Sequence, residues 1–218
     1  MTSVLRASLL VLSLLAGPAW PAPAEAALQE AIRRYEQGDR AGAEASLRAL
    51  SRQGVAAADY NLAVMHLRGG WPGASVAEAE RLLERAAKAG FVTAMFGLGQ
   101  LHEQGGLGRR DLARSHAWYL RAAEAGSVDA QVQAATAYYL GRGAARDRAA
   151  AARWYREAAK GGDIGAQYLV ASMYESGDGV EQDLRLARYW YDIAAKNGDY
   201  AAPIKVREID ERMRASSR

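Results

Sequence analysis

The alternation of apolar and polar positions between residues 164 and 199 indicates two helices. The first apolar stripe, at helical spacing, consists of Ala166, Leu169, Val170, Met173 and Tyr174. The second consists of Leu184, Ala187, Trp190, Tyr191 and Ala194. Gly177 and Gly179 lie between the stripes and supply the backbone freedom that a helix end and a turn require. Asp183 comes just before the second stripe, where it can cap the free N–H groups of a new helix. The pattern predicts a helix hairpin.

The same pattern recurs with a period of 36 residues, which gives four copies at 56–91, 92–127, 128–163 and 164–199. One series of glycines marks the ends of second helices: Gly54, Gly90, Gly126, Gly162 and Gly198. A Trp–Tyr pair recurs at Trp118–Tyr119, Trp154–Tyr155 and Trp190–Tyr191, with Leu82–Leu83 in the first copy. Asp111, Asp147 and Asp183 repeat the helix cap, and Ser75 takes that role in the first copy. A single hairpin cannot bury its own stripe, so neighbouring copies must stack. We therefore expect an all-α chain, an α-solenoid of stacked antiparallel helix hairpins.

The segments that flank the four copies continue the helical pattern. Residues 27–55 predict a shorter hairpin with its turn at Gly38–Asp39. Residues 200–218 predict one terminal helix with a short tail. Its outer face is polar, as the last element of a stacked array requires.

The spacing resembles a known family. Copy four contains Met173–Tyr174, Gly179–Val180, Asp183, Trp190–Tyr191 and Ala194–Ala195 in the order of the Sel1-like repeat, a relative of the tetratricopeptide repeat. The resemblance covers residues 56–199, about two thirds of the chain. It implies a right-handed α-solenoid, a stacked helical scaffold that binds other proteins.

The N-terminal segment, residues 1–26, resembles a secretory signal peptide. Arg6 precedes an apolar run from Ala7 to Gly17, which is too short to span a bilayer comfortably. Small residues then favour cleavage after Ala24 or Ala26. We expect a periplasmic or secreted protein that is not inserted in the membrane after cleavage. The chain has no cysteine, so it is not expected to be a lipoprotein.

Composition excludes several kinds of chemistry. The absence of cysteine rules out disulfides, thiol catalysis and Cys-ligated metals. The formal net charge is only +3, from 28 basic and 25 acidic residues that are interspersed. No dense basic stretch indicates nucleic-acid binding. We expect no cofactor and no nucleic-acid partner.

The three histidines are the first candidates for chemistry. His66 and His102 occupy one repeat position, filled elsewhere by Tyr138 and Tyr174. They are therefore interpreted as packed rings, with a metal site shared by adjacent copies as the alternative. A third series of ligands is missing, so we expect no metal. His116 aligns with residues of varied type and is expected on the surface. Because no catalytic motif is found, the chain is expected not to be an enzyme.

The tryptophans divide into two groups. Trp118, Trp154 and Trp190 recur with the period and are expected in the core. Trp71 lies outside the series, in a turn beside Pro72. It is either an exposed contact anchor or folded back on Leu82–Leu83, and the sequence leaves both open.

In a stacked array the first helices of the hairpins line an inner groove. The period leaves several polar or variable positions there as candidate partner contacts: Asn61, Val64, Arg68, Gln100, Gln104, Gln133, Thr136, Tyr139 and Ser172. Such a surface suits hydrogen bonding to a peptide. We therefore expect an exported, monomeric, non-enzymatic scaffold with a protein or peptide partner in the cell envelope. Two alternatives stay open: an enzyme that binds or hydrolyses β-lactams, like cysteine-rich relatives, and a protein that contacts peptidoglycan or another polysaccharide.

Overall fold

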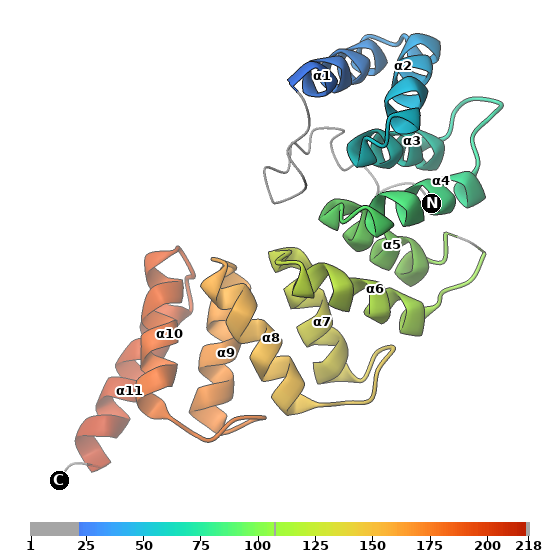
Figure 1. Ribbon diagram of the computed structural model, residues 1–218. Helices are drawn as coiled ribbons and strands as arrows, with labels where there is room; N and C mark the ends of the chain where they lie inside the picture. The colour runs from blue at the N-terminus through green and yellow to red at the C-terminus, as the bar shows by residue number, and fades with distance from the viewer. Residues whose placement is uncertain (1–21, 107, 217–218) are drawn as a thin grey trace. The chain divides into compact units, whose positions relative to one another are not determined.

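The structure, a computed structural model, describes residues 22–106 and 108–216. Within these ranges every regular element is an α-helix (Figure 1). Almost all of the expected signal peptide lies outside the described residues. Its last five residues, 22–26, belong to the first helix, which begins before both expected cleavage points.

The chain divides into two compact units at Asp111–Leu112. The helices of the first unit are α1 (Ala22–Glu36), α2 (Arg40–Arg52), α3 (Ala56–Arg68), α4 (Val76–Lys88) and α5 (Val92–Gln104). Each packs on the next, and α1 also touches α3. Leu47, Leu62, Leu83 and Leu98 are its most completely buried large side chains.

The second unit continues with the same construction. Its helices are α6 (Leu112–Glu124), α7 (Val128–Leu140), α8 (Arg148–Lys160), α9 (Ile164–Ser176), α10 (Leu184–Lys196) and α11 (Ala202–Ser216). Consecutive helices pack against each other from α6 to α11. The expectation of an all-α chain of packed hairpins is confirmed.

Most helix starts are fixed by short polar side chains. The caps expected at Ser75, Asp147 and Asp183 are present, and each accepts a hydrogen bond from a backbone N–H in the first turn of its helix. Asp163 does the same for α9, with its Oδ1 2.6 Å from the N–H nitrogen of Ala166. Val55 begins α3 without a side-chain cap, because there the apolar side chain is buried instead. Caps and packing thus share the task of starting helices.

Two kinds of glycine separate the helices. Gly162 has φ +95° and open space around the position of a Cβ. Gly179 also has a positive φ, +74°, but a Cβ there would lie 2.3 Å from the carbonyl oxygen of Arg148. Gly143 makes the same approach to Leu112, one repeat earlier. Gly143 and Gly179 thus let the turn that follows the first helix of one repeat approach the start of the second helix of the repeat before it.

The Trp–Tyr pairs contribute to the core unequally. Tyr119, Tyr155 and Tyr191 are all buried. Of the tryptophans, only Trp190 is buried. Trp154 is half-buried at the edge of the core, and Trp118 is half-buried with the guanidinium of Arg121 4.6 Å from its ring centroid. The expectation of a core residue is therefore confirmed for Trp190, whereas in the other two pairs the tyrosine is buried and the tryptophan only half-buried.

Candidate functional site

In the first unit, the expected groove residues differ in exposure. Asn61 and Val64 are buried, so the expectation that they face a partner is corrected. The Nδ2 of Asn61 donates to the carbonyl oxygen of Ala57 at 2.7 Å. Arg68 is exposed, with its guanidinium 5.7 Å from the ring centroid of Tyr35 on α1. On α5, Gln100 is half-buried and Gln104 is exposed.

Trp71 is folded back onto the protein. Its ring centroid is 5.0 Å from that of His66, and a side chain at Gly73 would collide with it. The Nε1 of Trp71 is buried, and the side chain as a whole is half-buried. Of the two alternatives, the structure therefore has the folded-back ring, which packs on His66.

His66 and His102 are buried rings, as their repeat position predicts. The Nδ1 of His66 accepts a hydrogen bond from the backbone N–H of Ser75 at 3.2 Å. Burial is the main cause that lowers its pKa. The Nε2 of His102 lies 3.6 Å from a carboxylate oxygen of Glu80. Both side chains therefore serve packing and local polar contacts.

His116 is buried, and the expectation that it lies on the surface was wrong. Its ring meets the ring of Tyr138 edge to face at 4.6 Å between centroids. Neither ring nitrogen has a hydrogen-bond partner among the described residues. Burial lowers the pKa of His116, because a charged ring would lose its hydration there.

In the second unit, two of the expected groove residues meet in a pocket. Tyr139 comes from the end of α7 and Ser172 from the middle of α9. The pocket has a volume of about 130 Å³. It is lined by Tyr139, Tyr155, Leu169, Ser172, Met173, Ser176 and Asp178. We call this site the α7–α9 pocket.

The two remaining groove candidates of α7 are half-buried. Thr136 lies beside the pocket: its Oγ1 is 3.0 Å from the hydroxyl of Tyr155 and donates or accepts there. This contact fixes the ring that forms one wall. Gln133 is not among the lining residues.

The charges at the rim of the α7–α9 pocket neutralise each other. Arg148, the first residue of α8, forms an ion pair with Asp178 in the turn after α9. Its guanidinium carbon lies 3.8 Å from the ring centroid of Tyr139, close enough for a cation–π interaction. Both ion-pair side chains are about one third exposed or less. The pocket thus has a fixed rim and no charge without a counter-charge among its lining residues.

Sequence reasoning missed five lining residues. Tyr155 and Met173 were placed in the core, which is where most of their surface lies. Leu169 was assigned to the buried stripe but is 42% exposed. Ser176 and Asp178 belong to the helix end and the turn, where only the fold shows that they approach Tyr139. A comparison of repeat positions could have found two members: Leu169 shares its position with Asn61 and Gln133, and Ser176 shares its position with Arg68 and Gln104.

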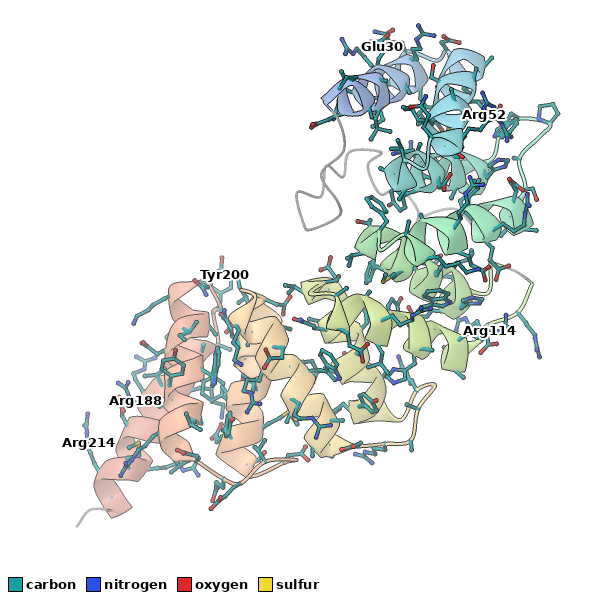
Figure 2. All side chains as sticks on the ribbon, in the orientation of Figure 1. Glu30, Arg52, Arg114, Arg188, Tyr200 and Arg214 are labelled. Atoms are coloured by element: carbon teal, nitrogen blue, oxygen red, sulfur yellow. The ribbon has the colours of Figure 1, made fainter. Side chains whose placement is uncertain are left out.

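A wider hollow of about 650 Å³ lies between the start of α10 and the end of α11. Its lining is mostly charged or polar: Gln182, Asp183, Leu184, Arg185, Asp210, Met213 and Arg214. Asp183 caps α10, and Asp210 pairs with Arg188, which is labelled with Arg214 in Figure 2. The acidic groups therefore already serve the fold.

Residues 22–106 and 108–216 contain no helix that is long and apolar enough to cross a membrane. Within the same ranges, no group of three or more His, Asp or Glu side chains is placed to hold a metal ion.

Comparison with known proteins identifies the family. The model of the Sel1 repeat matches residues 56–91, 92–127, 128–163 and 164–199. The chain belongs to the Sel1 repeat family, whose fold is a stacked helical scaffold that commonly mediates protein–protein interaction.

Two crystal structures are similar. One is a protective antigen present in uropathogenic Escherichia coli strains, which displays an SLR fold. Its sequence is 30% identical, the matched region covers 88% of this chain and 42% of the antigen, and the TM-score is 0.76. The other is a Sel1 repeat protein from Oxalobacter formigenes. Its sequence is 32% identical, the matched region covers 77% of this chain and 49% of the Oxalobacter protein, and the TM-score is 0.67. The chain spans less than half the length of either relative. A comparison with curated proteins gave no match.

Proposed function

We propose that the chain is an exported, non-enzymatic scaffold that binds an extended segment of a partner protein across α7 and α9. The α7–α9 pocket is the observation that carries this proposal, because it joins Tyr139 and Ser172 of the first helices with the exposed Leu169. A small pocket with apolar walls and a few polar groups suits one anchoring side chain of a bound protein segment. Membership of the Sel1 repeat family supports the same role.

The proposal is tested by capturing the partner from cell-envelope extract with the tagged chain, produced from its full-length gene. A matched bait carries Ser172→Arg, which places a long charged side chain across the pocket. A second control bait carries Arg153→Ala, an exposed position on α8 outside the pocket. We expect one protein to be recovered by the unchanged and Arg153→Ala baits and lost with Ser172→Arg, with unchanged helical content. Equal recovery by all three baits would remove the pocket from the interaction. Sustained nitrocefin turnover by the purified chain would favour the enzymatic alternative.

Export is supported by the pattern of residues 1–26: a positive start, an apolar run and two small-residue sites. Cell fractionation followed by sequencing of the protein's N-terminus tests this part separately. We expect the chain in the periplasm or medium, beginning at Glu25 or Ala27. A chain that stays in the cytoplasm with Met1 intact would overturn the export proposal and leave the binding proposal standing.

A further inference from the structure

We propose that the α7–α9 pocket receives one uncharged, apolar side chain of leucine to phenylalanine size, presented by the partner segment. This inference rests on the proposed function and specifies which residue the site recognises. Three observations carry it: the charge-paired counterpart of the pocket one repeat later, the chemistry of its walls, and its volume.

The repeat supplies an internal comparison. Four residues that line the pocket, Tyr139, Leu169, Ser172 and Ser176, correspond after 36 positions to Glu175, Lys205, Glu208 and Arg212. The equivalent space between α9 and α11 is therefore surrounded by charged side chains. The two equivalent spaces, between α7 and α9 and between α9 and α11, therefore differ in the side chains around them: mostly uncharged in the first and charged in the second.

The niche between α9 and α11 is closed by polar contacts. Glu175 accepts hydrogen bonds from Arg212 at 2.8 Å and from the hydroxyl of Tyr191 at 3.0 Å. Lys205 lies 3.8 Å from Glu175 and donates to Glu208 at 2.9 Å. Burial and the neighbouring Glu175 carboxylate raise the pKa of Tyr191, so its hydroxyl keeps its proton and remains a donor. These side chains therefore pair with one another across the face between α9 and α11.

The lining of the α7–α9 pocket has no such network of charged side chains. Tyr139, Leu169 and Met173 offer carbon surface instead of charge. The Asp178 carboxylate is the one charged lining group, and Arg148 pairs with it. A charged guest would lose hydration here without gaining a free counter-charge, whereas an apolar guest would remove carbon surface from water.

Size restricts the guest to a single side chain. The pocket measures about 130 Å³, well below the roughly 300–1,000 Å³ of typical small-molecule sites. It holds the equivalent of about four water molecules, at roughly 30 Å³ of liquid volume each. Ser172 and Ser176 also line the pocket. The hydroxyl of Ser176 donates to the carbonyl oxygen of Ser172 at 2.8 Å, and its oxygen can still accept a hydrogen bond from a peptide N–H beside the guest.

The test uses capped amino acids as probes and a methionine on the wall as the reporter. The chain is labelled with ¹³C-methyl methionine and titrated with N-acetyl methylamides of leucine, phenylalanine, glutamate and lysine. The Met173 signal is assigned with Met173→Leu. We expect leucine and phenylalanine probes to shift the Met173 signal with millimolar affinity, about what one small group supplies. The signals of Met65 and Met213, outside the pocket, should stay in place.

A matched pair of variants locates the effect. Leu169→Lys introduces the residue that the next repeat has at this position, and Leu169 is exposed enough for the fold to tolerate it. Leu186→Lys is the control, because Leu186 is similarly exposed, at 39%, on α10 outside the pocket. We expect Leu169→Lys to weaken the apolar probes at least about tenfold and Leu186→Lys to leave them unchanged.

Three results would overturn the inference. One is no Met173 shift with any probe up to its solubility limit. The others are a preference for the charged probes, and apolar binding that survives Leu169→Lys. If the apolar guest fails in this way while partner capture still depends on Ser172, the proposed function stands and only the recognised residue is wrong. If capture also fails to depend on Ser172, both proposals fall.

Discussion

Replacing Gly179 with alanine tests whether the turn after α9 depends on its contact with α8. Two costs combine in this variant. Any L-residue at the observed φ of +74° is strained, by roughly 1–2 kcal/mol. The added Cβ would also lie 2.3 Å from the carbonyl oxygen of Arg148, and this backbone atom cannot rotate away as a side chain could. Overpacking of this kind costs roughly 1–3 kcal/mol. The free energy of unfolding should fall by about 2–5 kcal/mol in all.

Gly162→Ala is the matched control, since Gly162 also has a positive φ but open space where its Cβ would be. Its expected cost is the backbone strain alone, about 1–2 kcal/mol. The difference between the variants, about 1–3 kcal/mol, corresponds to roughly 2–12 °C in Tm for a chain of this size.

Urea unfolding followed by far-UV circular dichroism measures the total loss in each variant. Hydrogen exchange in peptides from α8 and α9 shows whether the loss is local, as expected for an array held by neighbours. Equal destabilisation by the two substitutions would refute the reasoning, because the close approach to Arg148 would then contribute nothing.

Further predictions concern the core, a buried histidine and a helix cap. Tyr155→Ala should lower the free energy of unfolding by about 3–5 kcal/mol. Trp154→Ala should lower it less, because Tyr155 is buried and Trp154 only half-buried. Urea unfolding of both variants shows which substitution costs more. The lowered pKa of His116 means that the unfolded chain binds the proton more readily, so stability is full above about pH 6.5 and falls as the pH drops below it. His116→Phe should weaken this dependence and add roughly 1 kcal/mol by removing unpaired ring nitrogens, which melting curves at about pH 7.5 and about pH 5 would show. Asp163→Ala should cost about 1 kcal/mol through the lost hydrogen bond to Ala166; no change in urea midpoint would contradict its role as a cap.

The periodic features of the sequence predicted the fold well because each has a local physical cause. Gly177 is in the left-handed conformation that ends α9, and Asp183 caps the helix that follows. Both effects depend on residues only a few positions apart, so they can be inferred without knowing the tertiary structure. The hairpins and their bounds follow from them.

Exposure was harder to predict, because it depends on neighbours distant in the sequence. His116 shares its repeat position with Glu80, Ala152 and Arg188, and this variety suggested a surface site. Ala152 is nevertheless buried, so the position faces another helix, where a small residue or a long side chain with an apolar stem also fits. Variety at a repeat position therefore does not by itself indicate contact with water.

The exposure of the candidate site residues also depends on helices distant in the sequence. Asn61 and Leu169 occupy one repeat position, yet Asn61 is 4% exposed and Leu169 is 42% exposed. The helix pattern places them on the same face of α3 and α9, but the elements that cover the face differ, since α1 touches α3. Tyr139 and Ser172 could be named in advance as groove residues, whereas their meeting with Asp178 depends on the turn after α9.

The glycine contacts have a consequence for how such a chain can change in length. Gly143 approaches Leu112 and Gly179 approaches Arg148 across the same sequence distance, so one junction is a copy of the other. A duplication of 36 residues within this unit would therefore create a junction that the protein already makes. A shorter insertion in α9 would rotate Gly179 away from Arg148 by about 100° per added residue. Inserting or deleting a whole repeat therefore keeps the contacts between neighbouring repeats, whereas inserting or deleting one residue inside a helix breaks them.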